Sequence, residues 1–257
     1  MTRLRGDALL SALESGEVRV AEPLDGAWRV HAWVKEEILA IFRASEVVPI
    51  GRERELWPFV DKAAFPVRTF DAEQGVRLVP GGSSVRRGAF LGRGTVLMPP
   101  CYVNVGAWVG ADSMIDSHAL VGSCAQIGAR VHVSAGAQIG GVLEPVGSRP
   151  VIVEDDVLIG GQCGLYEGVL VRERAVLAAG VILTASTRVF DLVHERELTG
   201  TSSEPLQIPP NAVVVPGSRP LRGEWAREQR LSIACALVVK YRDARTDRRT
   251  ALEGALR

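Results

Sequence analysis

Residues 97–139 read LMPPCY VNVGAW VGADSM IDSHAL VGSCAQ IGARVH VSAGAQ I, with an aliphatic residue at the start of every group of six. The period extends back to Val79 and, after a shift of two positions across 140–152, resumes at Val153 and continues to Val189. Neither the 3.6-residue period of an amphipathic helix nor the two-residue period of a strand gives this pattern. It predicts a solenoid of hexapeptide repeats.

Six residues make one short strand and a turn, and three such units close a triangular coil. Each aliphatic side chain then points inward and stacks on the residue one coil, or 18 positions, later. Small residues suit the corners that follow the aliphatic positions, and they occur there as Gly92, Gly122, Gly128, Gly140 and Gly160, with Asn104 and Asp116 at equivalent places. The predicted fold class is therefore mainly β, a left-handed parallel β-helix over residues 76–190.

The flanking segments lack the six-residue period. Residues 7–15 and 31–44 have apolar positions at helical spacing, so 1–75 is expected to be a small, mainly helical N-terminal domain that caps the stack. The Gly- and Pro-rich insertion at 140–152 is expected to protrude as a loop, where a site can form.

The last segment, 191–257, is expected to hold strands and a helix. NAVVVPG (211–217) and LSIACALVVKYR (231–242) have the composition of strands, and TALEGALR (250–257) of a short final helix.

Composition argues against several classes of partner. Lys plus Arg and Asp plus Glu both number 30, so no net charge attracts nucleic acid or an anionic membrane. No apolar stretch reaches 18 residues, and Asp7 and Glu14 interrupt the apolar residues near the start, unlike a signal peptide. We therefore expect a cytoplasmic protein.

The cysteines and histidines show no metal-binding spacing. Cys101, Cys124, Cys163 and Cys235 lie far apart without a C-x-x-C pair, and we expect them to be buried free thiols. The spacing of the four histidines matches no common ligand pattern either. The sequence therefore predicts no metal site.

Five segments together resemble one family. They are 97–146, which begins with LMPPCYVN and ends with IGGVLEPV, and GVRLVP (75–80), RVAEP (19–23), VIVEDDVLIGGQCGLYEGVLV (151–171) and ASTRVFD (185–191). From about residue 17 to the C-terminus, the chain resembles the tetrahydrodipicolinate N-succinyltransferases, which are hexapeptide-repeat acyltransferases. The resemblance implies transfer of succinyl from succinyl-CoA to the amine of L-2-amino-6-oxopimelate, the open form of tetrahydrodipicolinate, in lysine and diaminopimelate synthesis.

The resemblance also implies the catalytic groups. Asp116 matches the family's catalytic aspartate, which holds and deprotonates the substrate ammonium, although an Asp at a coil corner can instead cap the turn. Glu167, in the EG pair, serves either structure or catalysis. The chain departs from the family at Gly164, where some members have a second glutamate, and at His118, where Trp is usual; His118 is a proton-transfer partner of Asp116 or a packing residue.

The binding residues follow from the same resemblance. Arg77, and more weakly Arg188, would hold the substrate carboxylates, because guanidinium binds carboxylate in a bidentate manner. Backbone N–H groups of Gly140 and Gly141 would stabilise the oxyanion. Residues expected to line the CoA groove between subunits are Ser134, Ala135, Gly161 and Ala179, beside Gly140 and Gly141.

The expected assembly is a homotrimer with active sites between subunits, an expectation from this architecture. Alternatives remain: a divergent relative that acylates another amino-dicarboxylate or uses acetyl-CoA, and a noncatalytic scaffold. A metalloenzyme of the γ-carbonic anhydrase type would need three converging histidines, but His118 and His132 fall at different phases of the repeat.

Overall fold

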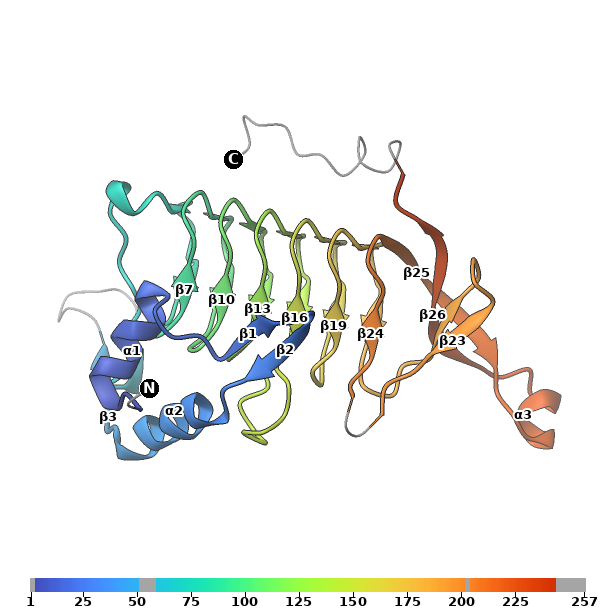
Figure 1. Ribbon diagram of the computed structural model, residues 1–257, viewed down its shortest axis with the longest axis horizontal. Helices are drawn as coiled ribbons and strands as arrows, with labels where there is room; N and C mark the ends of the chain where they lie inside the picture. Colours follow the sequence, from blue (N-terminus) through green and yellow to red (C-terminus); the bar gives the residue numbers. More distant parts are fainter. Residues whose placement is uncertain (1–2, 51–58, 202–203, 244–257) are drawn as a thin grey trace.

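A solenoid of short parallel strands forms the long axis of the molecule, with helices at one end and a long hairpin at the other (Figure 1). The computed structural model describes residues 3–50, 59–201 and 204–243. No helix in these ranges is long and apolar enough to cross a membrane. The solenoid is the left-handed parallel β-helix that the six-residue period predicts.

The solenoid has three faces, each a parallel sheet. The long face contains β5 (Arg77–Leu78), β8 (Val96–Leu97), β11 (Met114–Ile115), β14 (His132–Val133), β17 (Leu158–Ile159) and β20 (Val176–Leu177). The short face contains β6 (Ser84–Val85), β9 (Tyr102–Val103), β12 (Leu120–Val121), β15 (Gln138–Ile139), β18 (Gly164–Leu165) and β21 (Ile182–Leu183). The third face is called the hairpin face because an N-terminal hairpin packs on it. It contains β7 (Phe90–Leu91), β10 (Trp108–Val109), β13 (Gln126–Ile127), β16 (Ile152–Val153) and β19 (Leu170–Val171).

The strand register confirms the predicted stacking. Ile115 pairs with Leu97 on one side and Val133 on the other, each 18 residues away. All members of the aliphatic series from Val85 to Val189 are buried and belong to one core. Buried residues of the turns, such as Val131, Val157 and Cys163, complete this core, and their burial together supplies the hydrophobic free energy of the solenoid.

The first member of the series, Val79, was misplaced by one residue. Leu78, not Val79, pairs with Leu97 and packs against the core. Seven residues instead of six separate Leu78 from Val85, because Gly81 and Gly82 form an irregular turn with positive φ. The first coil therefore has a different phase from the rest.

The solenoid also continues past its expected end at residue 190. β24 (Gln207–Ile208) pairs with β19 on the hairpin face, and β25 (Ala212–Pro220) pairs with β20 on the long face. The chain leaves the stack after β21 and returns, which hides the last two rungs from a search for a continuous period.

Close approach of the coils explains a corner glycine. A Cβ on Gly122 would lie 2.3 Å from the backbone nitrogen of Gly141 on the next coil. The φ of Gly122 is not positive; the left-handed conformations occur further into the turns, as at His118 and Cys124. Asn104 and Asp116 instead accept a hydrogen bond from the following backbone N–H, at 2.8 and 2.7 Å.

The N-terminal segment packs on the side of the solenoid at its first coils. Its helices are α1 (Gly6–Ser15) and α2 (Ala32–Ala44). It also has two antiparallel hairpins and a short 3-10 helix: β1 (Ala21–Leu24) with β2 (Ala27–Val30), β3 (Val47–Ile50) with β4 (Phe59–Lys62), and η1 (Ala72–Gln74). Its core, which includes Leu10 and Ile38, extends to Val105 and Cys124 of the solenoid.

The β1–β2 hairpin lies against the hairpin face (Figure 1). Trp28 Nε1 donates to Glu154 at 2.9 Å, and Arg172 donates to the Gly26 carbonyl at 3.2 Å. The guanidinium of Arg19 lies 4.3 Å from the ring centre of Trp108 and donates to Gln126. The hairpin thus covers this face of the solenoid.

Beyond the solenoid, β25 and β26 (Ser232–Tyr241) form a long antiparallel hairpin that carries α3 (Glu224–Glu228) near its tip. β22 (Val189–Asp191) pairs with β26 and with β23 (Arg196–Leu198). The two expected strands are confirmed, whereas the expected helix at 250–257 lies outside the described residues.

Candidate active site

The turns between faces form two edges that carry most of the predicted site residues. The Asp116 edge joins the long face to the short face and comprises 79–83, 98–101, 116–119, 134–137, 160–163 and 178–181. The loop edge joins the short face to the hairpin face and comprises 86–89, 104–107, 122–125, 140–151 and 166–169. The width of the short face separates the two edges within one chain.

Asp116 directly follows β11 and is half-buried. Its Oδ1 accepts a hydrogen bond of 2.7 Å from the Ser117 N–H, which is the turn-capping contact that the sequence allows. Its Oδ2 lies 3.7 Å from Nε2 of His132, on the next rung. One carboxylate oxygen is therefore engaged in the turn, and the other faces an imidazole.

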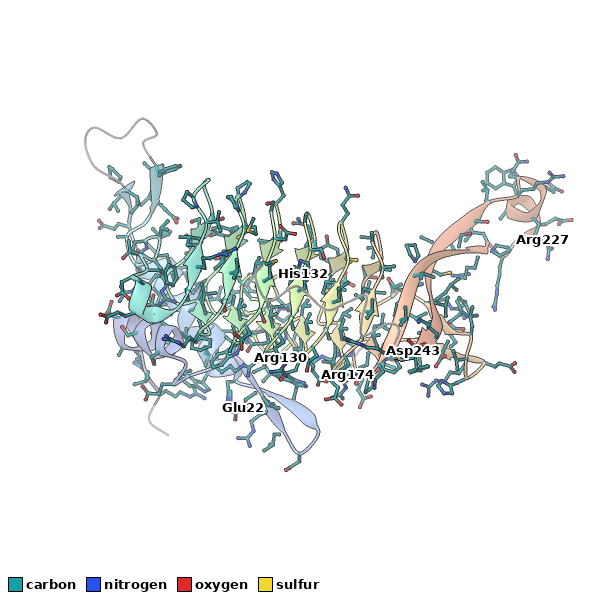
Figure 2. All side chains as sticks on the ribbon, turned by 90° about the horizontal axis from the view of Figure 1, so that it is seen from above. Glu22, Arg130, His132, Arg174, Arg227 and Asp243 are labelled. Carbon is teal, nitrogen blue, oxygen red and sulfur yellow. The ribbon has the colours of Figure 1, made fainter. Side chains whose placement is uncertain are left out.

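His132 was not among the predicted site residues, and for His118 the sequence left open a role in proton transfer or in packing. His118 is exposed on the Asp116 edge in a left-handed turn conformation. His132 projects outward from β14, midway along the solenoid, and its ring is largely buried (Figure 2). The 18-residue stacking could have identified it, because residue 134 stacks on Asp116 and His132 precedes it by two.

Ser134, Ala135, Gly161 and Ala179, which were expected to line only the CoA groove, all lie on the Asp116 edge. Ser134 and Ala135 lie one rung from Asp116, and Gly161 and Ala179 follow on the next two rungs. In the part of the chain that the structure describes, the N–H groups of Ala135, Gly161 and Ala179 donate no hydrogen bond. These three donors form a row with the spacing of stacked strands, about 4.8 Å.

Arg77 lies on the same side of the molecule as Asp116. It is exposed on β5, which is two rungs from β11 on the long face. That is about 10 Å at the spacing of paired strands. A small dicarboxylate could thus reach from Arg77 toward Asp116 along the outer surface of the long face.

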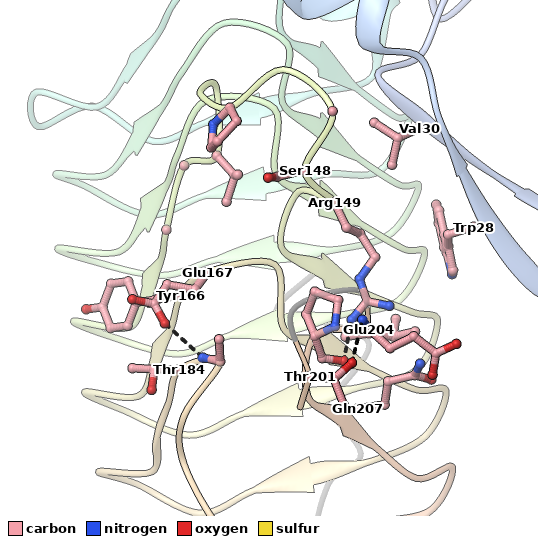
Figure 3. A pocket seen from close by; sticks show the side chains of 18 of the residues that line it. Trp28, Val30, Ser148, Arg149, Tyr166, Glu167, Thr184, Thr201, Glu204 and Gln207 are labelled. Carbon is pink, nitrogen blue, oxygen red and sulfur yellow. Dashed lines mark hydrogen bonds between the residues drawn. The ribbon is translucent and has the colours of Figure 1, made fainter. Parts of the chain in front are cut away.

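Gly140, Gly141 and Glu167 line a different region, a cavity of about 1030 Å³ at the loop edge (Figure 3). Its walls come from the β1–β2 hairpin, the insertion loop, the turn after β18, and the turns that lead out of and back into the solenoid. The insertion loop is held from behind by Lys35, whose Nζ donates to the Ser148 carbonyl at 2.7 Å.

The hydrogen bonds of Glu167, Gly140 and Gly141 limit the role that each can have in catalysis. Glu167 Oε2 accepts from the Ala185 N–H at 2.9 Å, so at least this oxygen stabilises the turn. The Gly140 N–H donates to Leu165 within the solenoid at 2.7 Å and cannot also stabilise an oxyanion. The Gly141 N–H has no acceptor among the described residues and remains a candidate.

Arg188 lies apart from both edges. Its guanidinium forms an ion pair with Glu197 on β23, and this contact raises the pKa of Arg188. An internal carboxylate thus already occupies the guanidinium that the sequence assigned to substrate. The remaining Arg candidate, Arg77, forms no ion pair with the described residues and is the better placed of the two.

The cysteines are free and buried, as expected. Burial raises the pKa of Cys101 and Cys163, and raises that of Cys124 to about 12. These thiols stay protonated near neutral pH and are poor nucleophiles. Within residues 3–50, 59–201 and 204–243, no three His, Cys, Asp or Glu side chains are grouped so that they could hold a metal ion.

Comparison with known proteins identifies the family. The profile of the tetrahydrodipicolinate N-succinyltransferase N-terminal region matches residues 7–44, and that of the hexapeptide repeat of succinyl-transferase matches 150–185. A 2,3,4,5-tetrahydropyridine-2,6-dicarboxylate N-succinyltransferase from Bradyrhizobium diazoefficiens is 44% identical over 258 residues, which cover 98% of this chain and 88% of the relative. The chain belongs to the tetrahydropyridine-dicarboxylate N-succinyltransferase family.

Other relatives agree with this assignment. A protein of the same name from Nitrobacter winogradskyi is 43% identical over 98% of this chain and 88% of its own. A solved Campylobacter jejuni structure, named as a 2,3,4,5-tetrahydropyridine-2-carboxylate N-succinyltransferase, superposes with a TM-score of 0.55 at 19% identity. It covers 97% of this chain and 65% of the Campylobacter chain, and supports the fold.

Proposed function

We propose that this protein transfers succinyl from succinyl-CoA to the amine of L-2-amino-6-oxopimelate, the open form of tetrahydrodipicolinate, in lysine and diaminopimelate synthesis. The observation that carries the proposal is the near-full-length identity of over 40% to relatives named for this reaction. The Asp116 edge supplies a carboxylate and a row of unused N–H donors suited to the chemistry.

In the proposed reaction the substrate amine attacks the thioester carbonyl carbon. Asp116 accepts the proton that the nitrogen loses as the C–N bond forms. The tetrahedral oxyanion is stabilised by backbone N–H donors, for which Gly141 is a candidate. Its collapse breaks the C–S bond, and the departing thiolate takes up the proton, giving the N-succinyl product and CoA.

The row of N–H groups at Ala135, Gly161 and Ala179 would bind the pantetheine arm of CoA. This arm carries two amide carbonyls, which need donors, and the small side chains leave room beside the backbone. Ser134 would flank the same groove. Arg77 would bind one carboxylate of the acceptor, because a guanidinium recognises carboxylate through two parallel hydrogen bonds.

Asp116 and Glu167 would meet only between subunits of a homotrimer. Within one chain they lie on different edges of the solenoid, separated by the short face. A three-fold arrangement of parallel solenoids would bring the Asp116 edge of one copy to a neighbouring copy. The site would then contain Asp116 from one subunit and Glu167 from the next.

A thiol-release assay tests the reaction. Purified protein is mixed with tetrahydrodipicolinate and either succinyl-CoA or acetyl-CoA, and free CoA is measured. The proposal predicts release with succinyl-CoA that depends on the acceptor. Faster release with acetyl-CoA would favour the divergent relative, and no release with any amino-dicarboxylate would favour the noncatalytic scaffold.

Mixed oligomers test the shared site. Asp116→Asn and Glu167→Gln chains are each purified, then dissociated and reassembled together. If the two residues come from different subunits, some mixed sites contain both native side chains and activity returns. If mixing restores nothing while both variants still form the native oligomer, the shared site is wrong.

A further inference from the structure

The cavity at the loop edge contains two arginines with different surroundings. Arg172 donates to Glu154 at 3.0 Å and is neutralised by it. Arg149, from the insertion loop, donates only to backbone carbonyls. In the described ranges, no carboxylate lies within ion-pairing distance of Arg149.

The contacts of Arg149 hold its guanidinium in one orientation. Its Nε donates to the Gly168 carbonyl and its Nη2 to the Pro205 carbonyl, each at 2.9 Å. Nη1 makes no hydrogen bond to the described residues. Nη2 also donates to the Leu206 carbonyl at 3.5 Å, so Nε and Nη2 are both engaged, while the hydrogens of Nη1 remain available.

Figure 3 shows Arg149 extending into the cavity between Trp28 and the turn that carries Thr201 and Glu204. Burial, and after it the nearby charge of Arg172, lower the pKa of Arg149 to about 10, although Glu204 partly offsets both effects. A half-buried guanidinium without a paired anion retains a desolvation cost that an anionic ligand would relieve.

The opposite wall of the cavity carries Glu167. One of its oxygens is bound to the Ala185 N–H, and the other is free to accept from a ligand. The cavity therefore presents a cationic group on one wall and an anionic group on another, which matches a ligand that carries both a carboxylate and an amine or ammonium group.

We propose that Nη1 of Arg149 binds a carboxylate group of a ligand in this cavity and thereby selects carboxylate-bearing substrates. The proposal rests on the proposed function for the identity of the two substrates, since both the succinyl donor and the amino-dicarboxylate acceptor carry a carboxylate. A carboxylate oxygen can accept a charge-assisted hydrogen bond from Nη1, which the fixed guanidinium holds in one direction.

Two matched ligand pairs test it by equilibrium binding. Succinyl-CoA is compared with butyryl-CoA, and L-2-aminopimelate with L-2-aminoheptanoate, because the members of each pair differ mainly in one carboxylate. Dissociation constants are measured for the native protein, Arg149→Met, Arg149→Lys, and the control Arg130→Met. Arg130 pairs with Asp156 on the remaining edge of the solenoid, outside the cavity.

Arg149→Met should weaken binding of the carboxylate-bearing member of one pair by about 10- to 100-fold and leave its counterpart within about twofold. The ligand pair whose binding changes shows whether the bound carboxylate belongs to the succinyl donor or to the acceptor. Arg149→Lys keeps the positive charge without the planar guanidinium, so its affinity for the carboxylate-bearing ligand should fall less. Arg130→Met should leave both pairs unchanged.

Three results would overturn the proposal: no loss for either pair, equal loss for both members of a pair, or a native protein with no preference for the carboxylate-bearing member. Equal loss would indicate damage to the insertion loop or a phosphate contact shared by both CoA esters. Turnover without a preference for the carboxylate-bearing ligand would disprove the carboxylate site alone. A selective loss of binding in Arg149→Met, in a protein that shows no turnover, would disprove the proposed function alone.

Discussion

His132 Nε2 lies 3.7 Å from Oδ2 of Asp116, across two rungs of the solenoid that stack directly on each other. Ser117 holds the other carboxylate oxygen through its N–H, so the carboxylate has a fixed orientation. This pair is the centre of the Asp116 edge.

Asp116→Asn should reduce turnover by at least about 100-fold, because an amide cannot accept the proton of the amine. The amide oxygen can still cap the turn, so the fold should persist. CoA release measures the first effect, and size-exclusion chromatography with thermal unfolding measures the second. Near-native turnover in a folded variant would remove Asp116 from the role of base.

His132→Asn should lower kcat by about tenfold or more with little change in KM, if the imidazole orients Asp116 or shares its proton. His118→Asn is the matched control on the same edge, and its exposed ring should be replaceable with less than about a twofold change. A larger effect at His118 than at His132 would contradict this assignment. The pH profile of kcat should change only for His132→Asn.

Gly122→Ala should destabilise the solenoid by about 1–3 kcal/mol, because its new methyl group would meet the Gly141 backbone at 2.3 Å and force the coils apart. Gly147→Ala, in the insertion loop, has nothing within 4 Å and should be close to neutral. Urea unfolding of both variants compares them. Equal stability would show that the coils can separate at no cost.

Lys35→Met should loosen the insertion loop. Lys35 is fully buried and burial lowers its pKa, yet its Nζ holds the Ser148 carbonyl. Amide hydrogens of 140–151 should exchange at least about tenfold faster in the variant. Lys62→Met removes a comparable bond, to the Ser45 carbonyl, and should leave this loop unchanged.

Asp191→Asn should cost about 2 kcal/mol or more at pH 7, because Asp191 is 1% exposed and binds His194, Arg196 and Tyr241. Burial alone would raise the pKa of Asp191, but these hydrogen bonds hold it well below its ordinary value. The native carboxylate therefore stabilises the fold above pH about 4, and this contribution is lost as the pH falls.

Thermal unfolding of the native protein and Asp191→Asn at several pH values checks this linkage. The difference in Tm should be largest near neutral pH and shrink on acidification. A constant difference would mean that the ionised form of Asp191 contributes nothing.

The six-residue period allowed the fold to be predicted, because the inward-facing positions stay aliphatic whatever residues occupy the outward-facing positions. The prediction was wrong where local geometry changed the number of residues between successive inward-facing positions. One extra residue at Gly81–Gly82 displaced the first coil, and the excursion through β22 and β23 concealed the rungs of β24 and β25.

The candidate site was only partly readable. The sequence and its family resemblance predicted Asp116, Arg77 and the small residues that the structure places on the Asp116 edge or on the long face beside it. They also assigned Arg188, which pairs with Glu197, and the Gly140 N–H, which donates within the solenoid. Such contacts depend on partners supplied by other strands and are invisible to local sequence patterns.

The sequence by itself determined the solenoid, the place of its inserted loop and the family. The tertiary structure alone decided that Asp116 faces His132, that Glu167 and Arg149 share a cavity, and that Asp116 and Glu167 occupy different edges. The physical reason is that burial of every sixth residue requires an aliphatic residue at every sixth position, and this pattern is visible in the sequence. The direction and pairing of polar side chains depend on which rungs and loops the folded coils bring together.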